Sequence, residues 1–232
     1  NEKTVKTIKV DIDEKEGIIS VFNDGKSIPI GIHKKEKMHV PEMIFGNLLT
    51  SSHYAEKKKV TGGKNGIGSK AVNIYSTDFW IEIVDDETKQ MYKQHFYDNM
   101  FKKDPPIITK STSAPYVKIT FKADFKKFDM KGLESQVVPL LKKRVYDCAG
   151  VSNKRVSVYL NGKKLNIKSF EEYINMFSQD DESESESGSV MSSKPVYEKL
   201  HDRWEVGMLY DPSAGFNQIS YVNGVCTYQG GT

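Results

Sequence analysis

The sequence is poor in the features that indicate a disulfide scaffold, a structural metal or a membrane anchor. Only two of its 232 residues are cysteine, Cys148 and Cys226, and neither stands in a metal-type spacing with histidine. A disulfide framework and a structural zinc site are therefore not expected, and a reducing compartment fits best. No stretch approaches the roughly 18 apolar residues of a membrane-spanning helix, and no signal peptide is recognisable, so no membrane partner is expected.

The chain also lacks a large excess of charge of either sign. The 34 Lys and Arg residues nearly balance the 31 Asp and Glu residues, and a net charge of +3 does not by itself predict nucleic-acid binding. Lysine pairs such as Lys126 and Lys127 are expected to be solvated. Hydrophobic residues make up 38% of the chain, which is enough for a core in one large domain or one and a half. The start at Asn1, without a methionine, predicts a piece of a longer protein.

Alternating apolar residues predict strands, and a 3.6-residue period predicts helices. The predicted strands are 4–11, 17–23, 79–84, 90–97, 116–121, 155–160, 164–167, 199–210 and 216–222. The predicted helices are 41–49, 69–75 and 130–150, and a fourth begins at Ser169 with Glu171 and Glu172 in its first turn. Asn161 and Gly162 give the strongest hairpin signal. The strands at 79–121 are expected to pair antiparallel.

A segment rich in serine and acidic residues interrupts this pattern at 179–193. Such a segment cannot bury apolar surface, so it is expected to be disordered. Its Ser-Glu repeats suit an acidophilic kinase, but a plain solvated loop is the favoured interpretation. Strands resume after it, and a new domain is expected to begin near Asp202.

The most informative stretch is residues 61–70, Thr-Gly-Gly-Lys-Asn-Gly-Ile-Gly-Ser-Lys. Glycines allow the backbone a positive φ and a close approach to a ligand. A helix that starts where the loop ends turns free N–H groups toward an anion, and Lys64 and Lys70 add mobile cations. The stretch is therefore predicted to bind phosphate, although it matches neither the Walker nor the dinucleotide fingerprint. The alternative is a flexible loop between two elements.

Two polar clusters are candidates to converge on that loop. Asn23 and Asp24 end a predicted strand beside a tight turn at Gly25, where an amide or carboxylate can hydrogen-bond the edge of a purine. The alternative is an Asx turn, in which the same side chains bond their own backbone. Three hydroxyls and an imidazole follow at 50–53, and they suit either a ribose or a helix stop.

Taken in order, these motifs resemble the amino-terminal ATPase region of type IIA DNA topoisomerases in their eukaryotic form. The resemblance covers nearly the whole chain apart from the acidic insert. The residues that carry it are 23–30, 40–52, 60–70, 73–77, 144–147, 158–162, 203–206, 222–224 and 230–232. The blocks at 41–52 and 203–206 belong to the topoisomerase pattern rather than to the chaperone or mismatch-repair members of the same superfamily.

The resemblance implies an α+β fold of the Bergerat type, with helices on one face of a mixed, mostly antiparallel sheet. It divides the chain into an ATP-binding domain at 1–178 that lacks its N-terminal helix, the acidic-serine insert at 179–195, and the beginning of a transducer domain at 196–232. The implied cofactors are ATP and Mg²⁺. The implied ATP-binding residues are Asn23 at the adenine, Ser51, Ser52 and His53 at the ribose, and Gly63, Lys64, Asn65, Gly66, Ile67, Gly68, Ser69 and Lys70 at the triphosphate.

Some positions depart from the family's usual pattern. His53 stands where the third ribose-side residue is usually Asn, and Ile67 and Ser69 stand where the phosphate loop usually has Tyr and Ala. Neither change is expected to abolish binding, because such a loop acts mainly through main-chain donors. The resemblance places the general-base Glu and the Asn that holds Mg²⁺ upstream of Asn1, so no catalytic or metal-binding residue is expected in this chain.

The implied function is ATP binding and hydrolysis coupled to the passage of one DNA duplex through another. The implied parent is a nuclear homodimer with a gate that closes on ATP binding and with DNA as its partner. The fragment is expected to bind nucleotide without turnover, because no pattern places Glu42 or Glu56 on the phosphate. The alternative is a non-catalytic nucleotide-sensing or protein-interaction module of the same superfamily.

Overall fold

The structure is a computed structural model that describes residues 4–48, 66–178, 194–210 and 215–227. Its strands are β1 (Thr7–Asp13), β2 (Ile18–Asp24), β3 (Ser76–Val84), β4 (Gln90–Tyr97), β5 (Lys102–Lys103), β6 (Ile107–Lys110), β7 (Tyr116–Ala123), β8 (Ser157–Leu160), β9 (Lys163–Lys164), β10 (Val196–His201), β11 (Trp204–Met208), β12 (Tyr221–Val222) and β13 (Val225–Cys226). Its helices are α1 (Val40–Gly46), α2 (Gly68–Ile74), the 3₁₀ helix Phe125–Phe128, α3 (Val137–Val151) and α4 (Phe170–Asn175). Within these ranges, no helix has the length and apolar character needed to cross a membrane.

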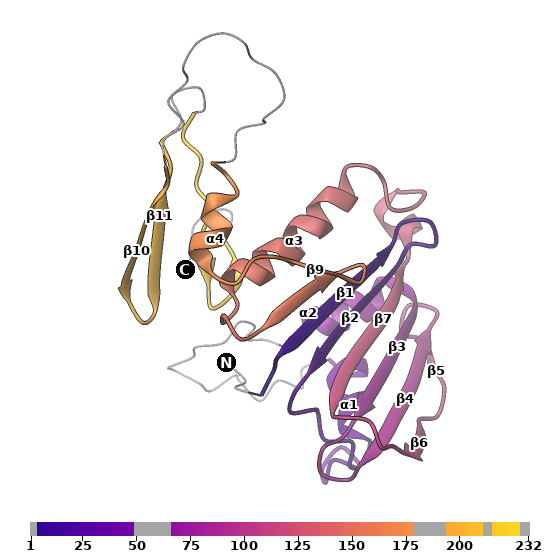
Figure 1. The fold of residues 1–232 in the computed structure, drawn as a ribbon. Coiled ribbons are helices and arrows are strands. Elements are labelled where there is room, and N and C mark those ends of the chain that lie inside the picture. Colours follow the sequence, from indigo (N-terminus) through magenta and orange to yellow (C-terminus); the bar gives the residue numbers. More distant parts are fainter. Residues whose placement is uncertain (1–3, 49–65, 179–193, 211–214, 228–232) are drawn as a thin grey trace.

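Nine of the described strands form one mixed sheet; Figure 1 shows its arrangement. Eight follow the order β5-β4-β3-β7-β2-β1-β8-β9, and β6 pairs with β4 at the edge. Every pair is antiparallel except that of β1 with β8. A parallel pair needs a long connection, and the chain between these two strands includes α3, which leads directly into β8. The predicted α+β class with a mostly antiparallel sheet is confirmed.

Both hydrophobic clusters lie on the same face of this sheet. Residues directly opposite each other in neighbouring strands share a face, so the register can be followed across the sheet in rows. One row contains, in order, Val158, Ile8, Asn23, Val117 and Ile83. Ile83 belongs to the cluster that packs against α1 and α2, and Val158 belongs to the cluster that packs against α3 and α4. The helices therefore cover one face, as the resemblance implies.

The helix predicted at 130–150 begins seven residues late. It starts at Val137, and Pro139 lies in its first turn. Proline has no N–H for the carbonyl four residues earlier, and its ring would clash with that carbonyl. A helix from Met130 would place Pro139 in its interior, whereas the first turn tolerates it.

Three strand predictions near the end of the chain also need correction. The single strand predicted at 199–210 is wrong, because the chain forms the β10–β11 hairpin with its turn at Asp202 and Arg203. The strand predicted at 164–167 is reduced to β9, and the side chains of Leu165 and Ile167 lie in the second hydrophobic cluster. Of the strand predicted at 216–222, only β12 is present.

A buried hydrogen-bonded group joins the chain after the serine-rich insert to α3 and α4. Tyr173 of α4 donates its hydroxyl to Asp147 Oδ1 of α3 over 2.6 Å, and the hydroxyls of Tyr173 and Tyr221 lie 2.9 Å apart. Lys143 and Arg144 donate to the same carboxylate over 2.8 and 3.1 Å. Burial raises the pKa of Asp147, but these donors outweigh it and hold the pKa below its usual value. We call Asp147, Tyr173 and Tyr221 the Asp147 joint.

The insert at 179–193 lies outside the described residues, so its predicted disorder stays a prediction. The domain boundaries at 178 and 196 stay predictions as well. After the insert, β10 and β11 form a separate hairpin beside α4 (Figure 1).

Candidate nucleotide-binding site

Asn23 is the polar member of an otherwise apolar row on the helix-covered face of the sheet. It lies at the end of β2, between Ile8 of β1 and Val117 of β7. Its Nδ2 donates to the main-chain carbonyl of Asp24 over 3.1 Å, and no described residue donates to its Oδ1. The amide therefore keeps one N–H and its oxygen for a ligand, which fits the donor and acceptor edge of a purine.

Asp24 has a role other than the two that the sequence suggested, a purine contact or an Asx turn. Its Oδ1 accepts the main-chain N–H groups of Lys6 and Thr7 over 2.7 and 2.8 Å. These donors belong to the start of β1, so the carboxylate fixes two strands together. It forms no Asx turn with its own backbone, and its Oδ1 is taken up by these two N–H groups.

The sheet face beside Asn23 is exposed. Val21, two residues earlier in β2, points to the same face and is 39% exposed although its strand lies in the middle of the sheet. Its neighbours across the strands are Val10 and Ile119. Ligand sites typically combine an apolar surface with a few orienting polar groups. Val21 and Asn23 together provide that combination for a flat aromatic base.

The described end of the predicted phosphate loop leads straight into a helix. Gly66 has a φ of +62°, and α2 begins at Gly68. Ile67 at the N-cap makes no side-chain capping bond, and the first N–H groups of a helix have no intrahelical acceptor. The local geometry thus agrees with a loop that offers main-chain donors.

Lys70 is not the mobile cation that the sequence suggested. It is 2% exposed, and its Nζ donates to the carbonyl of Gly66 over 2.6 Å. Burial lowers its pKa. In this structure Lys70 holds the end of the loop against the first turn of α2.

Asn73 is a structural residue to which the sequence assigned no task of its own. Its Nδ2 donates to the carbonyl of Phe45 in α1 over 3.1 Å, and its side chain is buried. Its Oδ1 is buried without a hydrogen-bond partner among the described residues. The amide ties α2 to α1, at the cost of one unsatisfied acceptor. A lone Asn inside the apolar pattern of 71–75 was the available signal.

Six of the predicted contacts lie outside the described residues. These are Ser51, Ser52, His53, Gly63, Lys64 and Asn65. Of the others, Asn23 and α2 share one face of the sheet, because Val72 of α2 packs against the first hydrophobic cluster on that face and α2 contacts β7, the strand beside β2. The assignment of all these residues to a nucleotide stays a prediction.

Glu42 is held by two partners and has no free carboxylate oxygen. Lys103 Nζ donates to one oxygen over 2.7 Å, and Gln94 Nε2 donates to the other over 3.1 Å. Burial raises the pKa of Glu42, but these hydrogen bonds outweigh it and keep the pKa below its usual value. A carboxylate with a lowered pKa is a weak general base. In the part of the chain described, no group of three or more His, Cys, Asp and Glu residues is placed to hold a metal.

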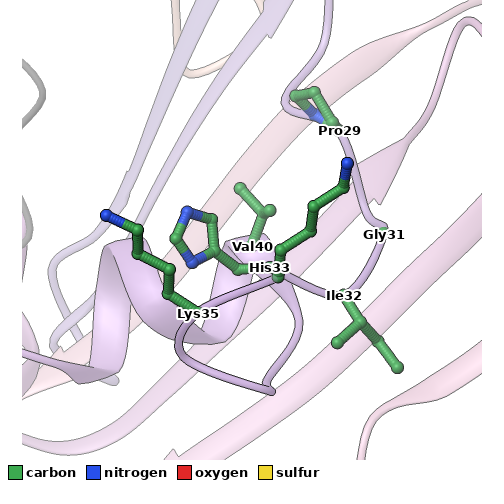
Figure 2. A pocket seen from close by; sticks show the side chains of 7 residues that line it. Pro29, Gly31, Ile32, His33, Lys35 and Val40 are labelled. Carbon is green, nitrogen blue, oxygen red and sulfur yellow. The ribbon is translucent and has the colours of Figure 1, made fainter.

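A hollow of about 530 Å³ opens elsewhere, at the connection between β2 and α1 (Figure 2). It is lined by Pro29, Gly31, Ile32, His33, Lys34, Lys35 and Val40. Neither Asn23 nor the described end of the phosphate loop contributes to it. We therefore do not assign the nucleotide to this hollow.

Comparison with curated proteins gives long matches at substantial identity. The chain is 46% identical over 233 residues to the probable DNA topoisomerase 2 of Dictyostelium discoideum, covering 100% of this chain and 15% of that protein. It is 46% identical over 228 residues to DNA topoisomerase 2 of Arabidopsis thaliana, covering 97% of this chain and 15% of that protein. The chain thus spans about a seventh of the length of these relatives. No family model matches it.

Solved structures agree with these relatives. The ATPase region of Saccharomyces cerevisiae topoisomerase II matches with a TM-score of 0.88 and 41% identity, over 98% of this chain and 57% of that one. The ATPase and transducer domains of DNA topoisomerase II from Balamuthia mandrillaris match with a TM-score of 0.84 and 36% identity, over 97% of this chain and 56% of that one. Sequence and fold together show that this chain belongs to the eukaryotic DNA topoisomerase 2 family, in which it matches the ATPase region.

Proposed function

We propose that this chain is the nucleotide-binding part of an ATP-dependent type IIA DNA topoisomerase. The observation that carries the proposal is the match over 98% of the chain to the yeast ATPase region. The geometry supports it, because Asn23, the exposed Val21 and α2 lie on one face of the sheet. In the whole protein, ATP binding closes a gate between two protomers, and hydrolysis resets it as one duplex passes through another. The whole protein, of which this chain is a part, acts on DNA in the nucleus as a homodimer.

Each part of the nucleotide has its own partners in this proposal. The Asn23 amide orients the adenine over Val21, and Ser51, Ser52 and His53 contact the ribose. The main-chain N–H groups of residues 63–70 surround the triphosphate, as glycine-rich loops at helix starts do. Mg²⁺, when bound, neutralises charge on the phosphate oxygens. No described side chain is assigned to hold Mg²⁺ or to activate water.

In this proposal Lys70 supports the phosphate loop from below rather than contacting the phosphates. Its Nζ engages the Gly66 carbonyl over 2.6 Å, so that oxygen, which would repel a phosphate, already has a partner. The neighbouring N–H groups are then left to face the anion. Lys70→Ala should weaken ATP binding more than adenosine binding, because only the triphosphate uses the loop. Equal losses for the two ligands would make Lys70 a purely structural residue.

The direct test is calorimetric titration of the 232-residue chain with Mg²⁺ and a non-hydrolysable ATP analogue. Gly68→Val is the informative variant, because a Cβ at Gly68 meets no atom of the described residues within 4 Å and the fold should tolerate it. Gly66→Val is less suitable, since its positive φ strains any side chain. We expect Gly68→Val to weaken binding at least about tenfold, or about 1.4 kcal/mol, by blocking the approach of the phosphates to the backbone.

Gly132→Val is the matched control, because a Cβ there also meets no atom within 4 Å and the residue lies outside the site. Parent-like affinity in the Gly68 variant would remove the phosphate-loop assignment. An ATPase assay on the same samples separates binding from turnover. If the unsubstituted 232-residue chain bound no nucleotide, that result would contradict the proposal.

A further inference from the structure

The connection between β2 and α1 contains a lysine-rich hairpin, and none of the predicted nucleotide contacts lies in it. Residues 31–40 form a short hairpin, which we call the basic hairpin. Lys34, Lys35 and Lys37 occupy three of the four positions at its tip, next to His33 and a single acid, Glu36. All three lysines are exposed. Among the described residues none of them has an ion-pair partner, so their charge faces solvent.

The basic hairpin is held in one conformation by its own backbone. The N–H of His33 donates to the Met38 carbonyl over 2.7 Å, and the N–H of Val40 donates to the Gly31 carbonyl over 2.9 Å. The N–H of Lys37 closes the tip on the His33 carbonyl over 2.9 Å, with Lys37 itself at a φ of +54°. The three lysines are thus presented on a fixed turn rather than on a flexible loop.

The base of the hairpin is anchored in the core. Ile30, which precedes it, is 3% exposed in the first hydrophobic cluster. His39 donates from Nδ1 to the Ile30 carbonyl over 2.6 Å, and its ring lies 5.5 Å from that of Tyr92 in β4. A charged group on a pre-positioned support loses less conformational entropy when it binds.

The hairpin borders the hollow of about 530 Å³ described above. Figure 2 shows the side chains of His33 and Lys35 on the same side of the chain, with Val40 beside them. Pro29, Ile32 and Val40 supply the apolar part of the lining, and Lys34 and Lys35 supply the cations. A concave surface with unpaired lysines at its rim suits a polyanion.

We propose that the basic hairpin contacts the phosphate backbone of duplex DNA. Phosphate contacts by lysine need charge and reach, and they need no base-specific group. Protein–protein interfaces typically depend on buried Trp, Tyr or Arg anchors, and no Trp, Tyr or Arg lines the hollow. The proposal rests on the proposed function, since the DNA partner comes from there, and it adds a place of contact within this segment.

The test is fluorescence anisotropy of a labelled 30-base-pair duplex with the full 232-residue chain at several KCl concentrations. The variant carries Lys34→Gln, Lys35→Gln and Lys37→Gln together. The matched control carries Lys126→Gln, Lys127→Gln and Lys131→Gln, which removes the same charge from three exposed lysines at the opposite end of the sheet. The slope of log K against log salt is negative, and each lost phosphate contact makes it less negative by about 0.9.

We expect the hairpin variant to bind the duplex at least about tenfold more weakly. Its salt-dependence slope should be less negative than that of the unsubstituted chain by up to about 2.7. The control should stay close to the parent. Equal losses in both variants would mean that only net charge matters, and they would overturn the proposal. Parent-like binding by the hairpin variant, no duplex binding by the parent, or tighter binding of poly-glutamate than of the duplex would do the same.

Calorimetric titration of both variants with the ATP analogue separates this proposal from the proposed function. The hairpin contains none of the predicted nucleotide contacts, so nucleotide affinity should match that of the parent. A hairpin variant that binds nucleotide normally and loses DNA supports the DNA contact. A hairpin variant that loses both ligands would show that the hairpin belongs to the nucleotide site, and it would overturn the assignment.

Discussion

Tyr173→Phe tests the Asp147 joint by removing one oxygen atom. The hydroxyl of Tyr173 donates to the buried Asp147 carboxylate over 2.6 Å and contacts the hydroxyl of Tyr221 over 2.9 Å. The ring of Tyr173 packs against Phe170 and Phe177, and phenylalanine keeps those contacts. The substitution therefore removes hydrogen bonds while leaving the packing nearly unchanged.

A hydrogen bond to a charged group contributes about 1.5–3 kcal/mol, and a buried group left without its partner is at the costly end of that range. Asp147 is 4% exposed, so water cannot replace the lost donor fully. Lys143 and Arg144 still neutralise the carboxylate, which avoids the larger cost of an unpaired buried charge. We expect Tyr173→Phe to lower the free energy of unfolding by about 2 kcal/mol.

The assay is urea unfolding of the parent and of single and double variants with Asp147→Asn. Because the two groups share a bond, the cycle should give a coupling energy of about 0.5–3 kcal/mol. Tyr197→Phe is the control, since its hydroxyl donates to Glu205 over 3.0 Å on an exposed hairpin and should cost at most about 1 kcal/mol. A Tyr173→Phe variant no less stable than this control, or a coupling energy of zero, would refute the reasoning.

Two further predictions concern the same region. The pKa of Asp147 lies below the value of about 3.9 in unfolded chains, so its stabilising effect is present above that pH and is lost as pH falls through the lower folded value. Unfolding measured from pH 7 to pH 2 should therefore depend less on pH below about pH 5 in Asp147→Asn than in the parent. Gly150→Ala should cost about 1–3 kcal/mol, because its Cβ would lie 2.6 and 2.7 Å from Tyr173 Cγ and Cβ, whereas Gly132→Ala, with no atom within 4 Å, should cost little in the same thermal melts.

The sequence correctly predicted those local features that depend only on residues adjacent in the chain. The strand predicted at 90–97 coincides with β4. Ser169 caps α4, since its Oγ accepts the N–H of Glu172 over 3.1 Å. Asn161 and Gly162 take the positive φ values, 47° and 75°, that the hairpin signal predicts. In each case the preference resides in neighbouring residues, so no distant contact is needed to set it.

The candidate site was predicted only in part. The glycine pattern predicted a backbone close to an anion; Gly66 takes a positive φ and α2 begins at Gly68, while the contact with an anion stays a prediction. The sequence did not indicate that Lys70 is buried, because a lysine among glycines gives no sign of which carbonyl its amine reaches. It also left Asp24 as a base-contact candidate, whereas the start of β1, 17 and 18 residues earlier, uses its carboxylate.

By itself, the sequence determined the type of most elements, the turn residues between them and the glycine loop, because these depend on backbone preferences of adjacent residues. Only the tertiary structure decided that β1 lies parallel to β8, that Asn23 faces the helices beside an exposed Val21, and that Asp147, Tyr173 and Tyr221 meet. Each of these depends on strand register or helix packing between residues far apart in the chain. A shift of register by one residue would turn Asn23 to the other face of the sheet.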